Sequence, residues 1–293
     1  MKYKKIMVTG SNGFLGREVV KKLKEKNYKV IEFDISNGLD ILDKKQLSKK
    51  LACVDAVIHL AGIIENTNPN LYDINVTGTK NLIECAIEEK VKKIVFLSST
   101  AVYGFTKGQI DEETEINPEN EYEKSKVEGE KLLFKNSKKI EFNIIRSAMI
   151  FGPNDYWRSM FKLLKKNFPL TSNGLNKFQI IYVLNLANLI IKILENGKNN
   201  EIYLASDKEK ISLIDFCRIV KKKLTGKENV RTIPTFIALI IGKITGKKII
   251  NKENIRHISK ERNYNTNKIK KIGYVQEYSQ ESAINETIKE LNL

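Results

Sequence analysis

The feature that most constrains this chain is a glycine-rich turn set between a short apolar run and an amphipathic pattern. The apolar run is Ile6–Val8, the turn reads TGSNGFLG over Thr9–Gly16, and apolar residues then recur at helical spacing over 15–23. Glycines in such a turn allow a tight bend and a close backbone approach to a pyrophosphate held at the helix N-terminus. We therefore predict a dinucleotide site that uses these turn residues: Gly10, Asn12, Gly13, Phe14, Leu15 and Gly16.

The next apolar run ends in an acidic residue. Val30–Phe33 is followed directly by Asp34. A carboxylate at this place can accept hydrogen bonds from both ribose hydroxyls of a dinucleotide, and it repels a 2′-phosphate. The sequence thus favours NAD(H) over NADP(H).

A tyrosine and a lysine four residues apart suggest acid–base chemistry. Tyr122 and Lys126 share one face of a predicted helix. An ammonium beside a phenol favours the phenolate, so we expect the pKa of Tyr122 to fall from about 10 towards neutrality. Such a pair can move a proton on or off an alcohol oxygen. A solvated helix face is the alternative, and the glycine turn together with Ser98 and Ser99 argues against it.

Strands and helices alternate through the first half of the chain. Apolar strand patterns cover 56–60, 94–97 and 142–145, and helical patterns cover 72–89 and 120–136. This alternation is typical of a parallel sheet covered by helices, with ligands at the carboxyl ends of the strands. We predict an α/β fold, a Rossmann-like doubly wound parallel sheet, with an NAD-binding domain over residues 1–150.

The second half is less regular, and we assign residues 151–293 mostly to a smaller C-terminal substrate-binding lobe. Elements within 180–206 are expected to return to the first domain. The apolar run Phe236–Ile241 could face lipid or substrate, but short apolar runs are usually core, so a buried helix of the lobe is favoured.

Composition restricts the remaining function classes. The net charge of +16 would suit nucleic acid, but lysines are spread over all 293 residues, so we expect no nucleic-acid partner. Phe236–Ile241 is too short to span a bilayer, and we expect no membrane partner. Three scattered cysteines indicate reduced thiols and a cytoplasmic protein. Two histidines leave almost no material for a metal site or a Ser/His/Asp triad, and we expect no metal.

The order of these motifs resembles the extended short-chain dehydrogenase/reductase family, and within it the NAD-dependent epimerase/dehydratase branch that acts on nucleotide sugars. The motifs are TGSNGFLG, Asp34, HLAG at 59–62, Asn75 with Gly78-Thr79, SSTAVYG at 98–104, and Tyr122/Lys126. The resemblance implies that Ser99, Tyr122 and Lys126 are catalytic, with Lys126 also on the nicotinamide ribose. It implies further cofactor contacts at Asp40, Ile41, Leu60, Ala61 and Gly62.

The chain also departs from that family. Thr100 and Ala101 stand where dehydratases and decarboxylases carry an acid, and Phe178 stands where an Arg usually grips the substrate diphosphate. The substrate contacts expected in their place are Thr100, Arg158, Lys177 and Arg256. The resemblance also implies a homodimer, in which the helices at 72–89 and 120–136 pair with their copies.

We predict an NAD-dependent nucleotide-sugar epimerase of the 4-epimerase type, which works by transient hydride transfer at a sugar hydroxyl carbon. The alternative is an NAD(H)-dependent reductase or dehydrogenase of a keto-sugar or another secondary alcohol, similar to 3β-hydroxysteroid dehydrogenases. A third possibility is a non-catalytic nucleotide-binding scaffold, which the set Ser99, Tyr122 and Lys126 speaks against.

Overall fold

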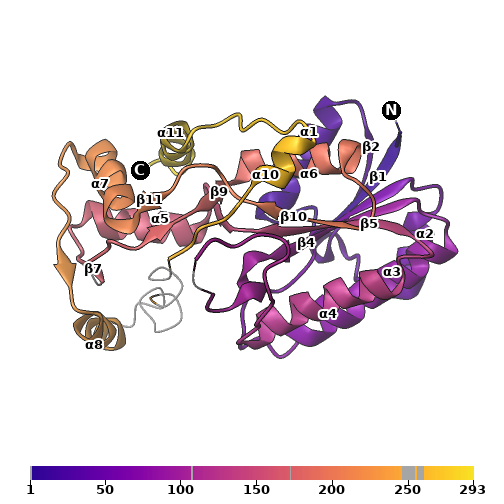
Figure 1. Ribbon diagram of the computed structural model, residues 1–293, viewed down its shortest axis with the longest axis horizontal. Helices are drawn as coiled ribbons and strands as arrows, with labels where there is room; N and C mark the ends of the chain where they lie inside the picture. The colour runs from indigo at the N-terminus through magenta and orange to yellow at the C-terminus, as the bar shows by residue number, and fades with distance from the viewer. Residues whose placement is uncertain (1, 107, 172, 246–254, 256–260) are drawn as a thin grey trace.

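A six-stranded parallel sheet forms the centre of the protein, which confirms the predicted α/β Rossmann-like fold (Figure 1). The computed structural model describes residues 2–106, 108–171, 173–245, 255 and 261–293. The strand order is β10-β5-β4-β3-β1-β2, and every neighbouring pair is parallel. The strands are β1 (Lys5–Thr9), β2 (Lys29–Phe33), β3 (Ala56–His59), β4 (Lys93–Ser99), β5 (Glu141–Ser147) and β10 (Glu201–Ala205).

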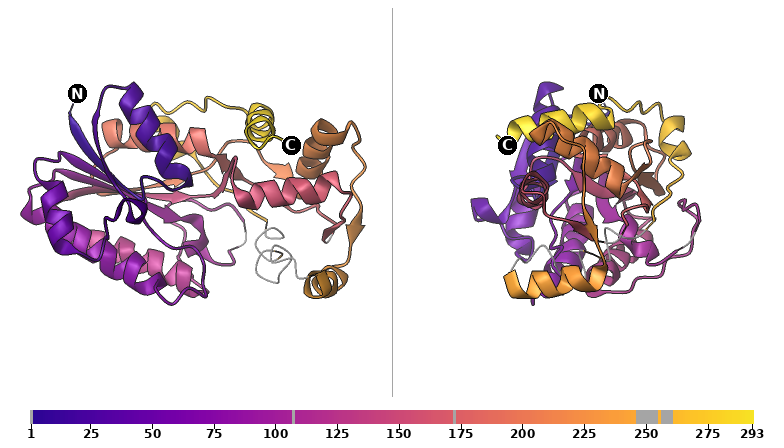
Figure 2. Two further views of the ribbon diagram at one scale, coloured as in Figure 1. Left: turned by 180° about the vertical axis from the view of Figure 1, so that it is seen from behind. Right: turned by 90° about the vertical axis from the view of Figure 1, so that its left-hand side faces the viewer.

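Helices cover both faces of this sheet (Figures 1 and 2). One face carries α1 (Phe14–Glu25) and α6 (Val183–Asn196), which pack against each other. The other carries α2 (Lys44–Leu51), α3 (Thr79–Glu88) and α4 (Glu121–Lys135). The strand Ala56–His59 is buried at every position, because helices cover the sheet on both faces.

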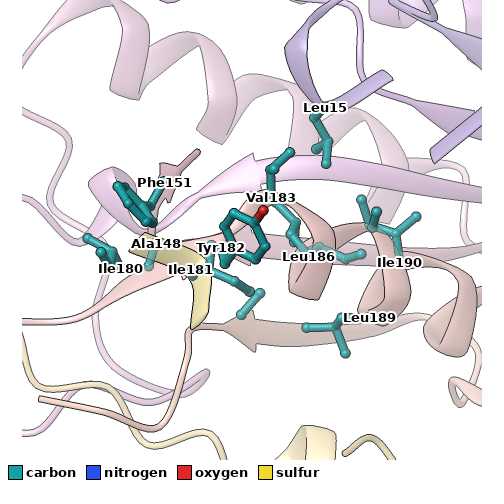
Figure 3. Close-up of a cluster of buried hydrophobic side chains, with 14 of the residues drawn as sticks. Leu15, Ala148, Phe151, Ile180, Ile181, Tyr182, Val183, Leu186, Leu189 and Ile190 are labelled. Atoms are coloured by element: carbon teal, nitrogen blue, oxygen red, sulfur yellow. The ribbon is translucent and has the colours of Figure 1, made fainter. Parts of the chain in front are cut away.

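The core on the α1 side ties the second half of the chain to the first. Figure 3 shows Tyr182, Val183 and Leu186 packed near Leu15 of α1. These side chains are buried, and α6 leads directly into β10, the edge strand beside β5. The segment from Val183 to Ala205 is therefore part of the sheet layer.

Most of the rest of the second half forms a lobe at the carboxyl side of the sheet (Figure 1). Its helices are α5 (Asp155–Lys165), α7 (Leu213–Thr225), α8 (Thr235–Thr245) and α11 (Gln280–Glu290), whereas α10 (Asn267–Lys271) packs on β10. Its short strands pair two by two: β6 (Met149–Phe151) with β9 (Ile180–Tyr182), β7 (Leu170–Thr171) with β12 (Thr232–Ile233), and β8 (Lys177–Phe178) with β11 (Ile211–Ser212).

Two predicted elements differ from the structure. The helix expected over 72–89 begins with a π-helical turn, Asp73–Gly78, before α3 starts. The run Phe236–Ile241 was expected to be buried, which is wrong for two of its residues: in α8, Phe236 is 65% exposed and Ile240 is 54% exposed. Ala238 is buried, and Ile237, Leu239 and Ile241 are half-buried, so α8 covers the lobe with one face only.

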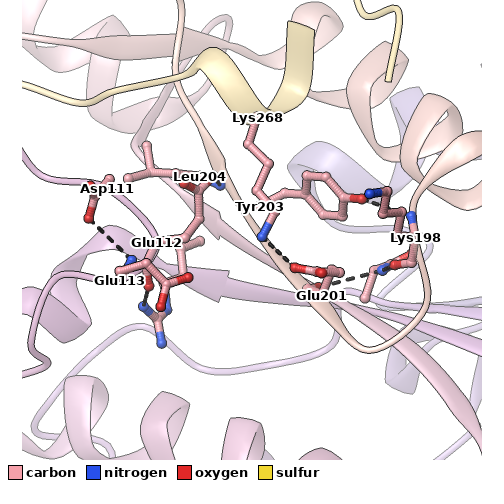
Figure 4. Close-up of polar contacts among 10 residues, drawn as sticks. Asp111, Glu112, Glu113, Lys198, Glu201, Tyr203, Leu204 and Lys268 are labelled. Carbon is pink, nitrogen blue, oxygen red and sulfur yellow. Dashed lines mark hydrogen bonds and ion pairs between the residues drawn. The ribbon is translucent and has the colours of Figure 1, made fainter. Parts of the chain in front are cut away.

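The outer side of the edge strand β10 is occupied by polar side chains (Figure 4). The Leu204 N–H donates to Oε1 of Glu112 at 2.9 Å, and Lys268 forms an ion pair with Glu201 at 2.5 Å. These groups border a hollow of about 330 Å³. Because an edge strand offers unpaired N–H groups, we read this cluster as protection of the edge rather than as a ligand site.

Candidate active site

The glycine turn is held against the next strand of the sheet. Gly10 has φ +68°, and a Cβ atom there would lie 2.8 Å from the Ala61 nitrogen and 2.9 Å from the Leu60 carbonyl carbon. A Cβ atom on Gly16 would lie 2.0 Å from the Gly10 oxygen. Only glycine fits these two positions, and the turn thereby brings the start of α1 beside Leu60 and Ala61 at the carboxyl end of β3.

The N-terminus of α1 fits an anionic group. Gly13 precedes the helix without a side-chain cap, and the first turn holds no acidic residue. The N–H groups of Phe14 and Leu15 belong to this uncapped turn, where phosphate groups bind well. The Leu15 side chain points into the core (Figure 3). The backbone, rather than that side chain, is thus suited to a pyrophosphate.

Asp34 lies beside the same turn. Its Oδ2 accepts the Asn12 N–H at 2.9 Å, and its Oδ1 accepts the Ser36 N–H at 3.0 Å and the Ser36 hydroxyl at 2.8 Å. Burial opposes ionisation, but these hydrogen bonds outweigh it and lower the pKa of Asp34. A carboxylate fixed beside the glycine turn fits a dinucleotide ribose.

Asp40 and Ile41 lie on the following loop. Asp40 Oδ1 accepts the Leu42 N–H at 2.9 Å, which closes a local turn. Ile41 is buried, and its Cγ2 lies 2.6 Å from the place where a Cβ on Gly78 would be. Ile41 therefore fills the space that Gly78 leaves.

His59 is buried at the end of β3 and is hydrogen-bonded through both ring nitrogens. Its Nδ1 lies 2.7 Å from the Thr9 hydroxyl, and its Nε2 lies 2.9 Å from the Thr79 hydroxyl. Since Thr79 donates its proton to the Asn75 carbonyl at 2.6 Å, Nε2 carries the imidazole proton and Nδ1 accepts from Thr9. Burial, together with the charge of Lys126, lowers the pKa of His59 to about 3, so the ring stays neutral.

Asn75 holds the loop after β3, a role that the sequence did not reveal. Its amide pairs with both backbone groups of Ile63, accepting the N–H at 2.7 Å and donating to the carbonyl at 2.8 Å. It also donates to the Ser125 hydroxyl on α4 at 2.9 Å. Asn75 stands on the π-helical turn, a deviation often found at functional sites. Gly62 is thereby placed beside Lys126, whose Nζ would lie 3.3 Å from a Cβ on Gly62.

Ser99, Tyr122 and Lys126 come together at the carboxyl end of β4. Ser99 lies near enough to the Tyr122 phenol for its side chain to lower the pKa of that phenol, against the effect of burial. The Lys126 ammonium donates to the Leu97 carbonyl at 3.0 Å and lies 5.9 Å from the centre of the Tyr122 ring. The Asn120 side chain caps α4, and Asn66 accepts the Tyr122 N–H at 2.9 Å, so the first turn of the helix is fixed.

The expected fall in the pKa of Tyr122 is not found. Burial raises this pKa, and it outweighs the lowering effect of Ser99. Burial also lowers the pKa of Lys126 to about 8, against the raising effect of the Glu130 charge. The sequence argument was wrong on this point because it weighed the charge of Lys126 and left out the loss of solvent around both groups.

A buried ion pair supports the ends of β4 and β5. The Arg146 guanidinium donates to Glu130 at 3.1 and 2.7 Å, and Ser98 donates to the same carboxylate at 2.5 Å. The side chains of Arg146 and Glu130 are 5% and 4% exposed. Arg146 also donates to the Tyr103 hydroxyl at 2.9 Å. Glu130 stands one helical turn after Lys126, so the pair fixes α4 against the strand that ends at Ser99.

The predicted substrate contacts are scattered. The Thr100 hydroxyl is buried and accepts from the Tyr264 hydroxyl at 2.9 Å. Arg158 donates to the Leu291 carbonyl at 2.9 Å, beside the C-terminal helix, and no contact of the described residues joins it to Tyr122. Lys177 is exposed on β8, and Arg256 lies outside the described residues.

Two residues near the site escaped the sequence argument. Tyr264 reaches Thr100, and Arg262 donates to the Gly104 carbonyl at 3.2 Å. Phe178, which stands where the family usually has an Arg for the substrate diphosphate, is buried against Phe216, with ring centres 5.7 Å apart. Residues 261–266 follow no helical or strand pattern, so no periodic signal marked them.

The described part of the chain has neither a metal-binding cluster nor a membrane-spanning helix. No group of three or more His, Cys, Asp or Glu side chains in this part of the chain could hold a metal ion. No helix in the same part is long and apolar enough to cross a membrane.

The chain is similar to known proteins over most of its length. Residues 6–205 match the NAD dependent epimerase/dehydratase family. The chain is 27% identical to the N-acetyl-alpha-D-glucosaminyl-diphospho-ditrans,octacis-undecaprenol 4-epimerase of Escherichia coli O157:H7, over 97% of this chain and 94% of that one. It is 29% identical to the UDP-glucose 4-epimerase of Vibrio cholerae, over 84% of each.

Solved structures share the fold. The UDP-glucuronic acid 4-epimerase from Bacillus cereus in complex with NAD superposes with a TM-score of 0.80 at 22% identity, over 98% of both chains. Other similar proteins are named dTDP-glucose 4,6-dehydratases, so the names of these proteins include more than one reaction.

Proposed function

This chain belongs to the NAD dependent epimerase/dehydratase family, whose cofactor is NAD, and on that premise we propose that it is a 4-epimerase of a diphosphate-linked sugar, with a nucleotide sugar as substrate. One observation carries the proposal: Ser99, Tyr122 and Lys126 meet at the carboxyl end of β4, where the Lys126 ammonium lies 5.9 Å from the centre of the Tyr122 ring. A hydroxyl, a phenol and an ammonium so arranged can remove and return the proton of a sugar hydroxyl.

The cofactor would lie between two features of the chain. The uncapped start of α1 at Gly13 suits the pyrophosphate, and Asp34 suits the adenosine ribose. We propose that Lys126 binds the second ribose and that Leu60, Ala61 and Gly62 line the path between them. Residues 1–150 with the returning segment 183–205 would hold NAD, and the remaining lobe would cover the substrate.

The protein's own groups would act on the sugar oxygen. Tyr122 would take the hydroxyl proton while the carbon that bears this oxygen loses hydride, which gives a keto-sugar. Return of hydride to the opposite face of that carbon, with return of the proton to the oxygen, would invert the carbon. Ser99 hydrogen-bonds the same oxygen and stabilises the charge on it. When bound, NAD⁺ supplies the hydride acceptor and a positive charge, and a positive charge near a phenol lowers its pKa.

The substrate that is turned over, and its product, distinguish the proposed epimerase from a dehydrogenase or a non-catalytic scaffold. Purified protein would be incubated with UDP-hexoses and with a sugar diphospho-polyprenol, the class in the name of the E. coli relative, and product epimers would be resolved by chromatography. We expect epimers without net NADH formation, since an epimerase returns its hydride. Net reduction of NAD⁺ by a simple secondary alcohol would instead establish a dehydrogenase.

Asp34 should select the cofactor. Asp34→Asn removes the charge that repels a 2′-phosphate and weakens the ribose hydrogen bonds, so the preference for NADH over NADPH should fall by about 10- to 100-fold. Calorimetric titration of both cofactors measures this preference. Glu32→Gln is the control, because Glu32 lies on the same strand but pairs with Lys24 at 2.7 Å. Equal binding of the two cofactors by the unmodified protein would refute the role of Asp34.

We also propose a homodimer through α3 and α4, which lie side by side on one face (Figure 1). We expect the apolar residues Val76, Ile87, Leu132 and Phe134 of the helices at 72–89 and 120–136 to face the partner; Phe134 is 45% exposed, Ile87 and Leu132 are half-buried, and Val76 is buried. Closed two-fold pairing is the commonest oligomer. Phe134→Glu should shift the mass measured by light scattering at micromolar concentration from dimer towards monomer. A monomer mass for the unmodified protein would contradict the proposal.

A further inference from the structure

The helix α8 presents an apolar stripe to the outside of the protein. Its sequence over Thr235–Thr245 is TFIALIIGKIT, in which Lys243 is the one charged residue. Phe236, Ile240 and Ile244 follow at intervals of four and lie on one face. Their side chains are 65%, 54% and 78% exposed. Three large apolar side chains in line on one exposed helix need a partner.

The helix is too short to cross a bilayer. Eleven residues rise about 16 Å, roughly half the thickness of a hydrocarbon core. A helix of this kind can lie in the plane of a membrane surface, with its apolar side chains inserted at the boundary between headgroups and acyl chains. The expectation of no membrane partner was based on the run being too short to span a bilayer. A contact that stays at the membrane surface does not require a span.

Exposed cations stand before and within α8. Lys227 and Arg231 are exposed in the segment before the helix, and Lys243 is exposed within it. The other cations from Arg218 to Lys223 form ion pairs with acidic side chains or are buried, in a chain of net charge +16. A second copy of this chain would bring like charges together at this place, whereas an anionic surface would complement them.

The position of α8 relates it to the candidate site. It lies at the end of the lobe, on the same side of the molecule as α4, which carries Tyr122 and Lys126 (Figures 1 and 2). A contact through α8 would therefore leave the helices α1 and α6 on the opposite side in solvent. The lobe beside the candidate site would touch the partner surface.

We propose that α8 docks this protein on the surface of an anionic phospholipid bilayer. Phe236, Ile240 and Ile244 enter the interface, and Lys227, Arg231 and Lys243 face the phosphate headgroups. The proposal rests on the exposed stripe and its charges, and it holds whichever sugar the active site takes.

Co-sedimentation with vesicles tests it on the full-length protein. We expect binding to vesicles of phosphatidylglycerol and phosphatidylcholine, weak binding to phosphatidylcholine alone, and weaker binding to the anionic vesicles as salt is raised. Ile240→Glu should lower the partition coefficient by about tenfold or more, because it removes an inserted aliphatic side chain and adds a repelled charge. Val275→Glu is the matched control, since Val275 is 81% exposed on the loop between α10 and α11.

Each other outcome overturns the proposal. Absence of binding to anionic vesicles would do so, as would equal binding by Ile240→Glu and the unmodified protein. A smaller mass of Ile240→Glu in light scattering, without vesicle binding by the unmodified protein, would identify α8 as a contact between copies. Circular dichroism checks that Ile240→Glu and Val275→Glu are folded. Turnover of a water-soluble substrate tests the active site separately from vesicle binding.

Discussion

Tyr122→Phe should lower turnover by about 10²–10⁴-fold, the usual contribution of a positioned acid or base. The substitution keeps the ring and removes the hydroxyl that Ser99 contacts. Folding and NAD affinity should survive, because the side chain is half-buried and the backbone N–H that donates to Asn66 remains. Steady-state turnover on whichever sugar is epimerised, with calorimetric titration of NAD, measures both.

Two companion variants separate the roles at this site. Lys126→Met should lose turnover and also weaken NAD, because Lys126 is proposed to bind ribose as well as to set the local charge. Ser99→Ala should lower turnover and leave NAD affinity unchanged. Tyr72→Phe is the control, since Tyr72 is 59% exposed at the start of the π-helical turn. Near-full activity of Tyr122→Phe would show that Tyr122 and Lys126 have no catalytic role and only share a helix face.

Glu130→Ala should destabilise the fold by about 3–5 kcal/mol, as measured by urea unfolding. The variant leaves the Arg146 guanidinium buried without its carboxylate, and Ser98 loses its acceptor. Both groups would then be desolvated without compensation.

Two further variants check that cause. Glu128→Ala on the same helix should change stability by less than about 1 kcal/mol, because its pair with Lys131 is exposed. Replacing Glu130 and Arg146 together by Met should restore much of the loss, since no unpaired charge remains. If the double variant is as unstable as Glu130→Ala, the unpaired charge is not the cause.

Local patterns in the sequence predicted the strands and the glycine turn of the first half of the molecule well. The turn from Thr9 to Gly16 specifies its own neighbours, because Gly10 and Gly16 leave room only for backbone. Asp34 follows β2 directly, so its place at the carboxyl edge is a consequence of strand direction. Short-range geometry of this kind can be read from residue order.

The sequence failed where distant segments meet. Nothing in the pattern around Arg262 and Tyr264 shows that they contact Gly104 and Thr100, more than 150 residues away. The pKa of Tyr122 depends on how much solvent the folded chain removes, which spacing on a helix does not contain. The exposure of α8 likewise depends on which elements pack beside it, and the apolar run alone favoured burial.

The contact between Tyr264 and Thr100 has a consequence for how the protein is made. Ile110 exchanges two backbone hydrogen bonds with residues 263 and 265, so a segment near the end of the chain completes the wall of the candidate site. Domains form from the N-terminal end during synthesis. Residues 1–205 can therefore fold on the ribosome before residues 261–266 emerge, and the contact to Thr100 forms only afterwards.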